Sequence, residues 1–551
     1  MDKSFAKDSA VLALATLLSR VTGQLRAILL VFAIGATGFL ADAFDIANTI
    51  PGSLNIIITG GIFNAILVPQ FVKSKRFKNA DERVNKLLTF SCSFVFLISL
   101  LLTVGAGIII TVISSQTWSP AQRDLAIFFG FLCMPQVFFY GLYTLLGQAL
   151  VSRQKYAAYG FAPIANNVVS CIIFLYYIIR VGGISNIDPS VTIFPTWQIL
   201  LLGVGSTFGI ALQAIILIPA LKRSGFKFKP IFSVRGFGLR TVAKTSSWAF
   251  LTVLIEQIAA LWLINIISSA PSQALQSGID QVTIGGNAAW TNALVIYIVP
   301  HSMITISLST TLFTKISHLV ASNNSAELAK EFTTGLRMDV YIINFFATFF
   351  IVMAIPLVHV LIPSTSESEA VIIGWAVIAL STKLMAAGIC QICSRVFFAF
   401  EKTKWFFLLD VPEQFLTVSL SIGATLLLSP DKWLFGIGIA TSIALWSGAA
   451  MCLLTVRYKL LFDNFKLGDF VAFLSKNIAI CIILSGLLNL SITQVNAFMG
   501  LNSSSWWFNF AFCAVMTIIT LVLYVGMSKL MRINEADVIV SKISQRLRLA
   551  K

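Results

Sequence analysis

The stretch SAVLALATLLSRVTGQLRAILLVFAIG, residues 9–35, combines a long apolar run with two arginines, Arg20 and Arg26. About 20 mostly apolar residues form a helix long enough to cross a bilayer, so this run predicts a membrane-spanning helix. A charged side chain at mid-bilayer depth costs about 2.5–3.5 kcal/mol on insertion scales. We therefore expect both arginines to face an aqueous cavity or paired acids rather than lipid.

The same pattern of long apolar runs continues along the chain. Of its 551 residues, 57% are hydrophobic and 11% are charged, against about 45–50% and about 25% in soluble domains. This composition excludes a water-soluble protein and a protein with a single anchor, and it predicts an all-α polytopic membrane protein with about fourteen transmembrane helices. The expected spans lie near 9–35, 39–72, 87–114, 124–151, 157–180, 198–221, 245–270, 286–314, 338–362, 368–400, 405–429, 433–456, 470–490 and 506–528.

Two of these spans are unusually long. The second contains Pro51 and the tenth contains Gly388. Long interrupted spans are typical of tilted or broken helices beside a cavity. We therefore expect irregular helices at both places.

Lysine and arginine are distributed unevenly between the loops. Most of the 39 basic residues lie in one alternate set of loops, and the opposite set holds only Arg123, Arg180 and Lys432. Because loops rich in Lys and Arg stay in the cytoplasm, we expect both termini to be cytoplasmic and the number of spans to be even. Membrane topology thus accounts for the net charge of +16, and nucleic acid is not an expected partner.

A weak internal repeat relates the two halves of the chain. The small-residue stretch at 61–71 has a counterpart at 307–316, and the junction at 147–155 has one at 396–404, each six spans later. An even offset gives both halves the same orientation, which predicts two pseudo-symmetric six-helix lobes with a candidate substrate site between them. The expected divisions are an N-lobe, a C-lobe, and a C-terminal helix pair with a cytoplasmic tail: 1–221, 222–456 and 457–551.

The segment SRVTGQLR, residues 19–26, resembles the SRxxGxxR signature that opens the MurJ (MviN) family of lipid II flippases. The resemblance spans the whole chain, and residues 292–317 resemble the branch from high-GC Gram-positive bacteria. It implies the fold of the multidrug/oligosaccharidyl-lipid/polysaccharide exporter superfamily, and a lipid-linked peptidoglycan precursor as cargo. Further agreement lies in several short stretches: Ala41–Phe44, Ile50-Pro51, Gly61–Phe63 and Arg395–Ala399.

The chain departs from the family pattern at two cationic positions. Family members commonly carry an arginine pair after the proline of span two, where this chain has Asn55 and Ile56. Their Asp-Arg pair in span eight falls on Leu294 and Val295. The resemblance therefore implies a cavity lined by fewer cationic side chains than is usual in the family.

Arg20 and Arg26 match the family signature cleanly, with Asp42 close by in the sequence. Guanidinium binds phosphate oxygens bidentately, so we expect both arginines to bind the diphosphate of the cargo. On one helix they lie about 9 Å apart along the axis and about 120° apart around it. They can therefore bind one ligand together only if the helix bends or if their long side chains extend around the helix. The expected set comprises substrate-binding Arg20, Arg26, Asp42, Glu256, Lys383 and Arg395, ion-coupling Asp42 and Asp45, and hinges at Gly23, Pro51 and Gly52.

Several of these residues also have a structural interpretation. Asp42 and Asp45 share a helix face, and they either couple to a cation or proton or pair with arginine. Glu256 either faces the cavity or makes a helix–helix hydrogen bond. Arg395 lies near the cytoplasmic end of its span and can snorkel to the interface. The glycines and prolines are either hinges or close-packing positions.

The preferred function is a flippase that moves a lipid-linked peptidoglycan precursor across the bacterial cell membrane by alternating access. Alternatives are an exporter of another lipid-linked polysaccharide or of drugs, and a non-transporting cell-wall scaffold. We expect no enzyme activity, metal or cofactor, since no loop carries a catalytic pair. Na⁺, H⁺ and membrane potential remain open as energy sources, the last supplying about 2.3 kcal/mol per charge at 100 mV. Membrane lipids, and proteins of cell-wall synthesis and division, are further candidate partners.

Overall fold

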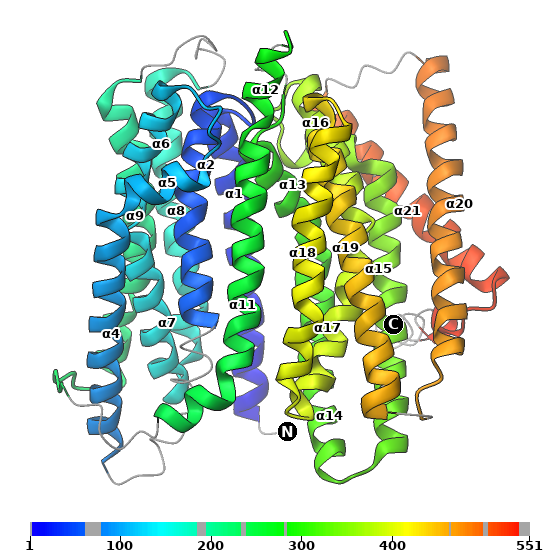
Figure 1. Cartoon of the computed structure of the whole chain (residues 1–551), viewed down its shortest axis with the longest axis horizontal. Helices are drawn as coiled ribbons and strands as arrows, with labels where there is room; N and C mark the ends of the chain where they lie inside the picture. The colour runs from blue at the N-terminus through cyan, green and yellow to red at the C-terminus, as the bar shows by residue number, and fades with distance from the viewer. Residues whose placement is uncertain are drawn as a thin grey trace. The chain divides into compact units, whose positions relative to one another are not determined.

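The computed structural model describes residues 3–60, 79–183, 194–232, 239–279, 284–461, 464–499, 505–538 and 541. Within these ranges the regular structure is helical and no strand occurs, so the predicted all-α fold is confirmed (Figure 1). The helices are α1 (Lys3–Ile34), α2 (Phe39–Ile56), α4 (Ala80–Val104), α5 (Ala106–Ile113), α6 (Pro120–Cys133), α7 (Gln136–Ser152), α8 (Tyr156–Val181), α9 (Thr196–Ile215), α10 (Leu217–Arg223), α11 (Leu239–Ser268), α12 (Ala270–Gln276), α13 (Asn287–Pro300), α14 (Ile306–Ala321), α15 (Ser325–Leu361), α16 (Glu367–Ser381), α17 (Leu384–Ala399), α18 (Thr403–Leu427), α19 (Trp433–Thr455), α20 (Leu467–Met499) and α21 (Trp506–Leu530).

The predicted membrane spans correspond closely to these helices. Among the described residues, 12 helices are long and apolar enough to cross a membrane, and the bent pair α16–α17 brings the number to 13. The second expected span, 39–72, is described only as far as residue 60, and the first partner of the internal repeat, 61–71, lies outside the described residues. The chain is thus a multi-pass membrane protein.

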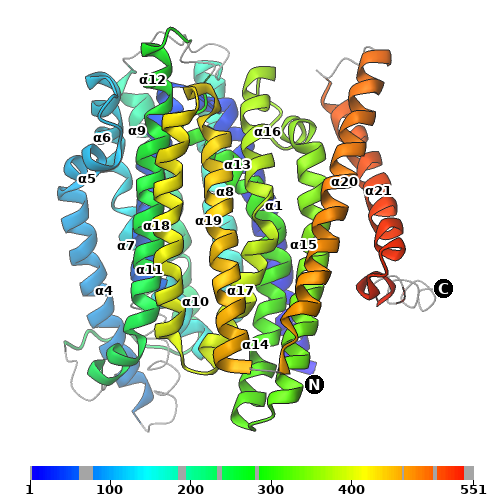
Figure 2. The ribbon, with the colours of Figure 1, turned by 45° about the vertical axis from the view of Figure 1, so that its right-hand side comes forward.

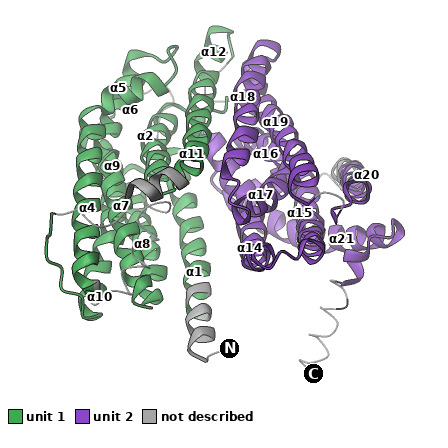
Figure 3. Ribbon diagram, turned by 60° about the horizontal axis from the view of Figure 1, so that its bottom comes forward, with its two compact units in different colours: residues 1–288 green, residues 289–551 purple. Residues whose placement is uncertain are grey.

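Contacts between residues divide the chain into two compact units, residues 1–288 (unit 1) and residues 289–551 (unit 2) (Figure 3). Helix α11 packs against α2 and α5 and so belongs to unit 1. The expected lobes, 1–221 and 222–456, are defined by a sequence repeat rather than by contacts. Those lobe boundaries, and that of the tail at 457–551, stay a prediction.

Close helix packing in unit 1 depends on small residues. Helix α9 lies against both α6 and α8. A Cβ atom on Gly203 would come within 2.7 Å of Leu132 on α6, and one on Gly205 within 2.8 Å of Ile173 on α8. Such positions let membrane helices approach closely, so that van der Waals contacts hold the bundle together.

Helix α15 is the centre of unit 2, and both C-terminal helices, α20 and α21, pack against it (Figure 2). Asn344 of α15 donates from Nδ2 to the carbonyl of Asn477 on α20 (2.8 Å) and to the hydroxyl of Tyr524 on α21 (3.2 Å). The Tyr524 hydroxyl donates in turn to the carbonyl of Tyr341 on α15 (2.8 Å). Buried hydrogen bonds therefore attach the C-terminal helix pair to unit 2.

The tenth span is broken, as expected. The break lies at Thr382–Lys383, where α16 and α17 meet at 44°, and Gly388 lies inside α17. The indole of Trp446 on α19 donates to the carbonyl of Thr382 (3.0 Å). A backbone group released by the break thus finds a partner, which a membrane interior requires.

Proline accounts for a second irregularity. Pro300 ends α13 and has no N–H to continue the helical hydrogen bonds. A π-helical turn, His301–Thr305, follows it before α14 begins. By contrast α2 stays helical through Pro51 as far as Ile56, and π-helical residues follow at 57–60.

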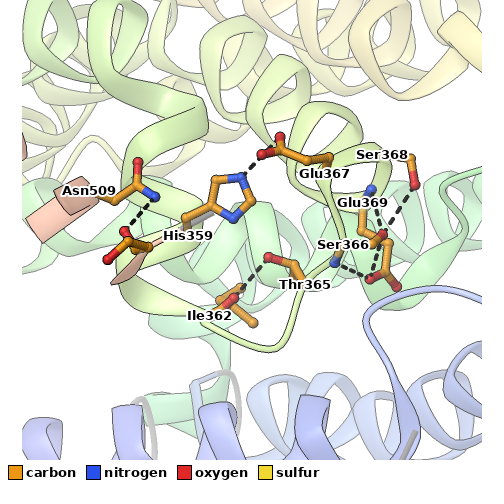
Figure 4. A network of polar contacts seen from close by, with 9 residues as sticks. His359, Ile362, Thr365, Ser366, Glu367, Ser368, Glu369 and Asn509 are labelled. Atoms are coloured by element: carbon orange, nitrogen blue, oxygen red, sulfur yellow. Dashed lines mark hydrogen bonds and ion pairs between the residues drawn. The ribbon is translucent and has the colours of Figure 1, made fainter. Parts of the chain in front are cut away.

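The turn between α15 and α16 is held by side chains (Figure 4). Ser366 caps α16: its hydroxyl accepts from the N–H of Glu369 (3.3 Å), and the Glu369 carboxylate accepts from the N–H of Ser366 (2.9 Å). His359, near the end of α15, lies 3.3 Å from the carboxylate of Glu367. This capping box satisfies backbone donors that the start of a helix leaves open.

Candidate functional site

Arg20 and Arg26 both lie on α1, which runs without interruption through Gly23. Arg20 is exposed and Arg26 is half-buried. Beside Gly23, the amide of Asn167 on α8 donates to the hydroxyl of Thr22 (3.0 Å). A Cβ on Gly23 would lie 3.5 Å from that amide, an ordinary contact. Gly23 therefore lies in a continuous helix beside α8, and its role as a hinge stays a prediction.

The guanidinium of Arg26 is close enough to two side chains of unit 1 to interact with them electrostatically. They are Tyr140 on α7 and Cys171 on α8. A polar phenol within electrostatic range of the guanidinium offsets part of the cost of placing a charge in a membrane span. Diphosphate binding by Arg20 and Arg26 stays a prediction.

Asp42 is 2% exposed and lies in the first turn of α2. Its Oδ1 accepts from the N–H of Ala288 (2.9 Å), and the N–H of Asn287 also bonds to the carboxylate. These two residues open α13 and belong to unit 1. The first N–H groups of a helix have no partner within it, and its positive end favours a carboxylate. Asp42 thus caps α13, and its predicted action on the arginines and on a coupling ion stays untested.

We expect Gly286→Ala to destabilise the protein, because a Cβ there would overlap the carboxylate of Asp42. Overpacking of this kind costs about 1–3 kcal/mol, which lowers the temperature of thermal unfolding in detergent. In an Asp42→Ala background the methyl group has room, so the same substitution should cost much less. Gly423→Ala is the control, since its Cβ would meet nothing within 4 Å. An equal cost of Gly286→Ala in both backgrounds would contradict the predicted overlap.

The remaining candidates of unit 1 lie on α2 and α11, which pack against each other. Asp45 and Glu256 are half-buried, and Pro51 is buried. A Cβ on Gly52 would have no neighbour within 4 Å. Close packing therefore does not explain the glycine at 52, which leaves its predicted role as a hinge open.

Lys383 lies at the break between α16 and α17 and has three partners in unit 2. Its Nζ donates to the hydroxyl of Thr441 on α19 (3.0 Å) and lies 5.4 Å from the ring centroid of Tyr297 on α13. Glu413 on α18 attracts it electrostatically. A cation within a membrane span needs partners of this kind. The structure thus brings Lys383 together with an acid, a hydroxyl and an aromatic face.

Arg395 lies on α17, with its guanidinium carbon 5.9 Å from the ring centroid of Phe313 on α14. Its Nε is buried and has no hydrogen-bond partner among the residues that the structure describes. Twelve helical positions separate Lys383 from Arg395, which is about 18 Å along the axis. These two cations are therefore too far apart to bind one phosphate group.

Asp339 on α15 is a buried acid that sequence reasoning missed. It is 0% exposed, and its Oδ1 accepts from the hydroxyl of Thr305 in the π-helical turn (2.8 Å). Its Oδ2 has no hydrogen-bond partner within the described ranges, and Gly388 packs directly against it. An Asp at the expected edge of span 338–362 indicates an interfacial residue. It is buried because α15 packs there against the π-helical turn and α17, which hydropathy does not show.

Comparison with known proteins identifies the family. The sequence model described as lipid II flippase MurJ matches residues 31–509. The chain belongs to the lipid II flippase MurJ family. Members of the MurJ family are transporters rather than enzymes. The predicted membership of the MurJ family is thus confirmed by a match that begins after Arg20 and Arg26.

Individual relatives agree with the family match. A protein named probable lipid II flippase MurJ from Rickettsia prowazekii is 23% identical over 454 residues, which is 80% of this chain and 81% of the relative. A solved lipid II flippase MurJ in an inward closed conformation superposes with a TM-score of 0.71 at 19% identity, covering 95% of this chain and 98% of that one. An inward-facing MATE multidrug transporter of the MOP superfamily has a TM-score of 0.62 at 13% identity, covering 81% and 94%. The fold is therefore shared by MurJ proteins and drug exporters.

Proposed function

We propose that this protein moves lipid II, a lipid-linked peptidoglycan precursor, from the cytoplasmic to the outer leaflet of the bacterial cell membrane by alternating access. The match to the MurJ family model across residues 31–509 carries this proposal. The fold alone does not separate lipid II from other cargoes, because MATE drug exporters share it. The family match does favour lipid II.

The proposed cargo site uses Arg20 and Arg26 on α1 to bind the diphosphate of lipid II. Arg20 is exposed and Arg26 is half-buried, so packing does not enclose either side chain completely, which supports contact with a ligand. Each guanidinium presents a planar fork of donors that fits two phosphate oxygens. The precursor is made inside the cell and used outside it, so we also propose functional contact with proteins of cell-wall synthesis and division.

Depletion of the protein tests the proposed cargo. We expect lipid II to accumulate in the cytoplasmic leaflet, where a reagent that cannot cross the membrane does not reach it from outside. Restoring the wild-type chain should return lipid II to the outer leaflet. Retention of a drug without any change in the leaflet distribution of lipid II would support the exporter alternative instead.

We also propose that both termini lie in the cytoplasm, on the basis of the uneven distribution of Lys and Arg. Single cysteines at Ser224, after α10, and at Asp431, between α18 and α19, should then react with impermeant reagents from opposite sides of the membrane. Only the cysteine at 431 should react in intact cells. Labelling of both cysteines from outside would rule out this topology.

A further inference from the structure

A pocket of about 490 Å³ lies in unit 2, at the ends of three segments. They are the first turns of α15, the start of α20, and the short helical segment 534–538 after α21. Its volume falls within the range of small-molecule sites, about 300–1,000 Å³. Three cationic side chains line it: Lys330, Arg337 and Lys466.

Arg337 forms a fixed wall of this pocket. Its Nε and Nη2 donate to the two carboxylate oxygens of Glu535, at 2.5 and 3.1 Å. Its guanidinium also lies over the ring of Phe473 on α20, 4.4 Å from the centroid. Lys529 and Asp537 form a further ion pair at 3.5 Å. The wall contributed by residues 534–538 is therefore held in place by charge pairs.

The remaining charge in the pocket is positive. The ammonium groups of Lys330 and Lys466 make no ion pair or hydrogen bond within the described part of the chain. Glu535 is neutralised by Arg337. Asp469 lies in the first turn of α20, where the positive end of the helix favours an acid. With Arg337 and Glu535 paired, Lys330 and Lys466 outweigh Asp469, so the lining of the pocket carries a net positive charge.

The length of α15 indicates that the pocket lies outside the hydrocarbon core of a bilayer. Helix α15 has 37 residues and is about 55 Å long, whereas the hydrocarbon core of a bilayer is about 30 Å thick. The pocket involves only the first part of α15, from Ala326 to Met338. This end of the helix therefore projects beyond the hydrocarbon, on the side with the basic loops.

We propose that this pocket binds a phosphate group, carried either by an anionic phospholipid headgroup or by a soluble phosphate compound. Lys330 and Lys466 supply the charge that attracts it, and Arg337 the rigid wall. The site is separate from Arg20 and Arg26, and it does not depend on the identity of the transported cargo. A bound phosphate group contacts both α15 and the start of α20, and so helps to hold the C-terminal helix pair, α20 and α21, against α15.

The test uses the full-length protein purified in detergent and the double variant Lys330→Gln, Lys466→Gln. Phosphatidylglycerol binding is counted by native mass spectrometry, with zwitterionic phosphatidylcholine for comparison, and inorganic phosphate binding is measured by calorimetry. We expect phosphate-group binding to weaken by about tenfold or more in the double variant, since each lysine attracts an anionic headgroup. The matched control, Lys402→Gln with Lys404→Gln, removes the same charge from the start of α18 and should bind like wild type.

Ala326→Trp provides a second variant that leaves every charge in place. Ala326 is exposed and lines the pocket, so an indole there should occupy the space and reduce binding without disturbing the core. Loss of phosphatidylglycerol binding alone assigns the site to lipid, whereas loss of inorganic phosphate binding in lipid-free protein assigns it to a soluble compound. If neither probe binds the wild type more tightly than both pocket variants, the proposal is wrong.

Discussion

Replacing both Arg20 and Arg26 with Ala should abolish lipid II transport while the protein still inserts and folds. Each guanidinium offers a charge-assisted, bidentate contact to phosphate. Contacts to charged groups contribute about 1.5–3 kcal/mol each, so losing two lowers the transport rate by about 100-fold or more. The helix should tolerate the change, because Arg20 is exposed and Ala is a strong helix former. Leaflet distribution of lipid II in cells that carry only the variant is the measurement.

The control for this experiment is Arg180→Ala with Arg223→Ala. These arginines lie at the ends of α8 and α10, so the net charge falls equally without a change on α1. Lysine at positions 20 and 26 should retain part of the activity, because the charge survives but the planar fork does not. Normal lipid II transport by the double Ala variant would show that the protein moves its cargo without these arginines.

Replacing Lys383 with Met should destabilise unit 2, and adding Glu413→Gln should recover most of the loss. Glu413 attracts Lys383 electrostatically within the bundle, so removing the cation takes that compensating charge away from the carboxylate. Leaving one charge uncompensated inside a protein costs more than replacing both charges with neutral groups. Gln keeps the hydrogen-bonding groups of Glu413 but carries no charge.

The temperature of thermal unfolding in detergent measures this difference. Lys432→Met, at an exposed position between α18 and α19, is the control for the loss of one positive charge. The double variant should unfold at a temperature closer to wild type than Lys383→Met does. Equal destabilisation by the single and double variants would show that Lys383 acts through Thr441 or Tyr297 rather than through the charge of Glu413.

Apolar runs predicted the helices well, and side-chain partners poorly. The run at 368–400 indicated an interrupted span, and the structure shows the bend at Thr382–Lys383. Sequence reasoning predicted Lys383 as a substrate-binding residue but gave it no partner. Its partners depend on how the neighbouring helices are rotated about their axes, and hydropathy carries no information about rotation.

Asp42 is a second residue whose partner the sequence did not predict, and this partner lies far away in the chain. Its position in the second span predicted an acid that either couples to a cation or proton or pairs with arginine. The structure gives it the N–H of Ala288, which is 246 positions away, a partner that the sequence did not indicate. An acid accepts equally well from a guanidinium and from the open end of a helix. Which one it finds is decided by the tertiary packing of α2 against the start of α13.

The sequence by itself determined the membrane class, the positions of the spans and the family. These follow from local composition and from a short motif around Arg20 and Arg26, because crossing a bilayer requires about 20 apolar residues wherever they occur. Tertiary structure alone decided the cap made by Asp42, the burial of Asp339 against Gly388, and the pocket beside Arg337. Each of these joins helices distant in the chain. The choice depends on which faces pack together, because van der Waals fit and hydrogen bonds, rather than hydrophobicity, select contacts between helices in a membrane.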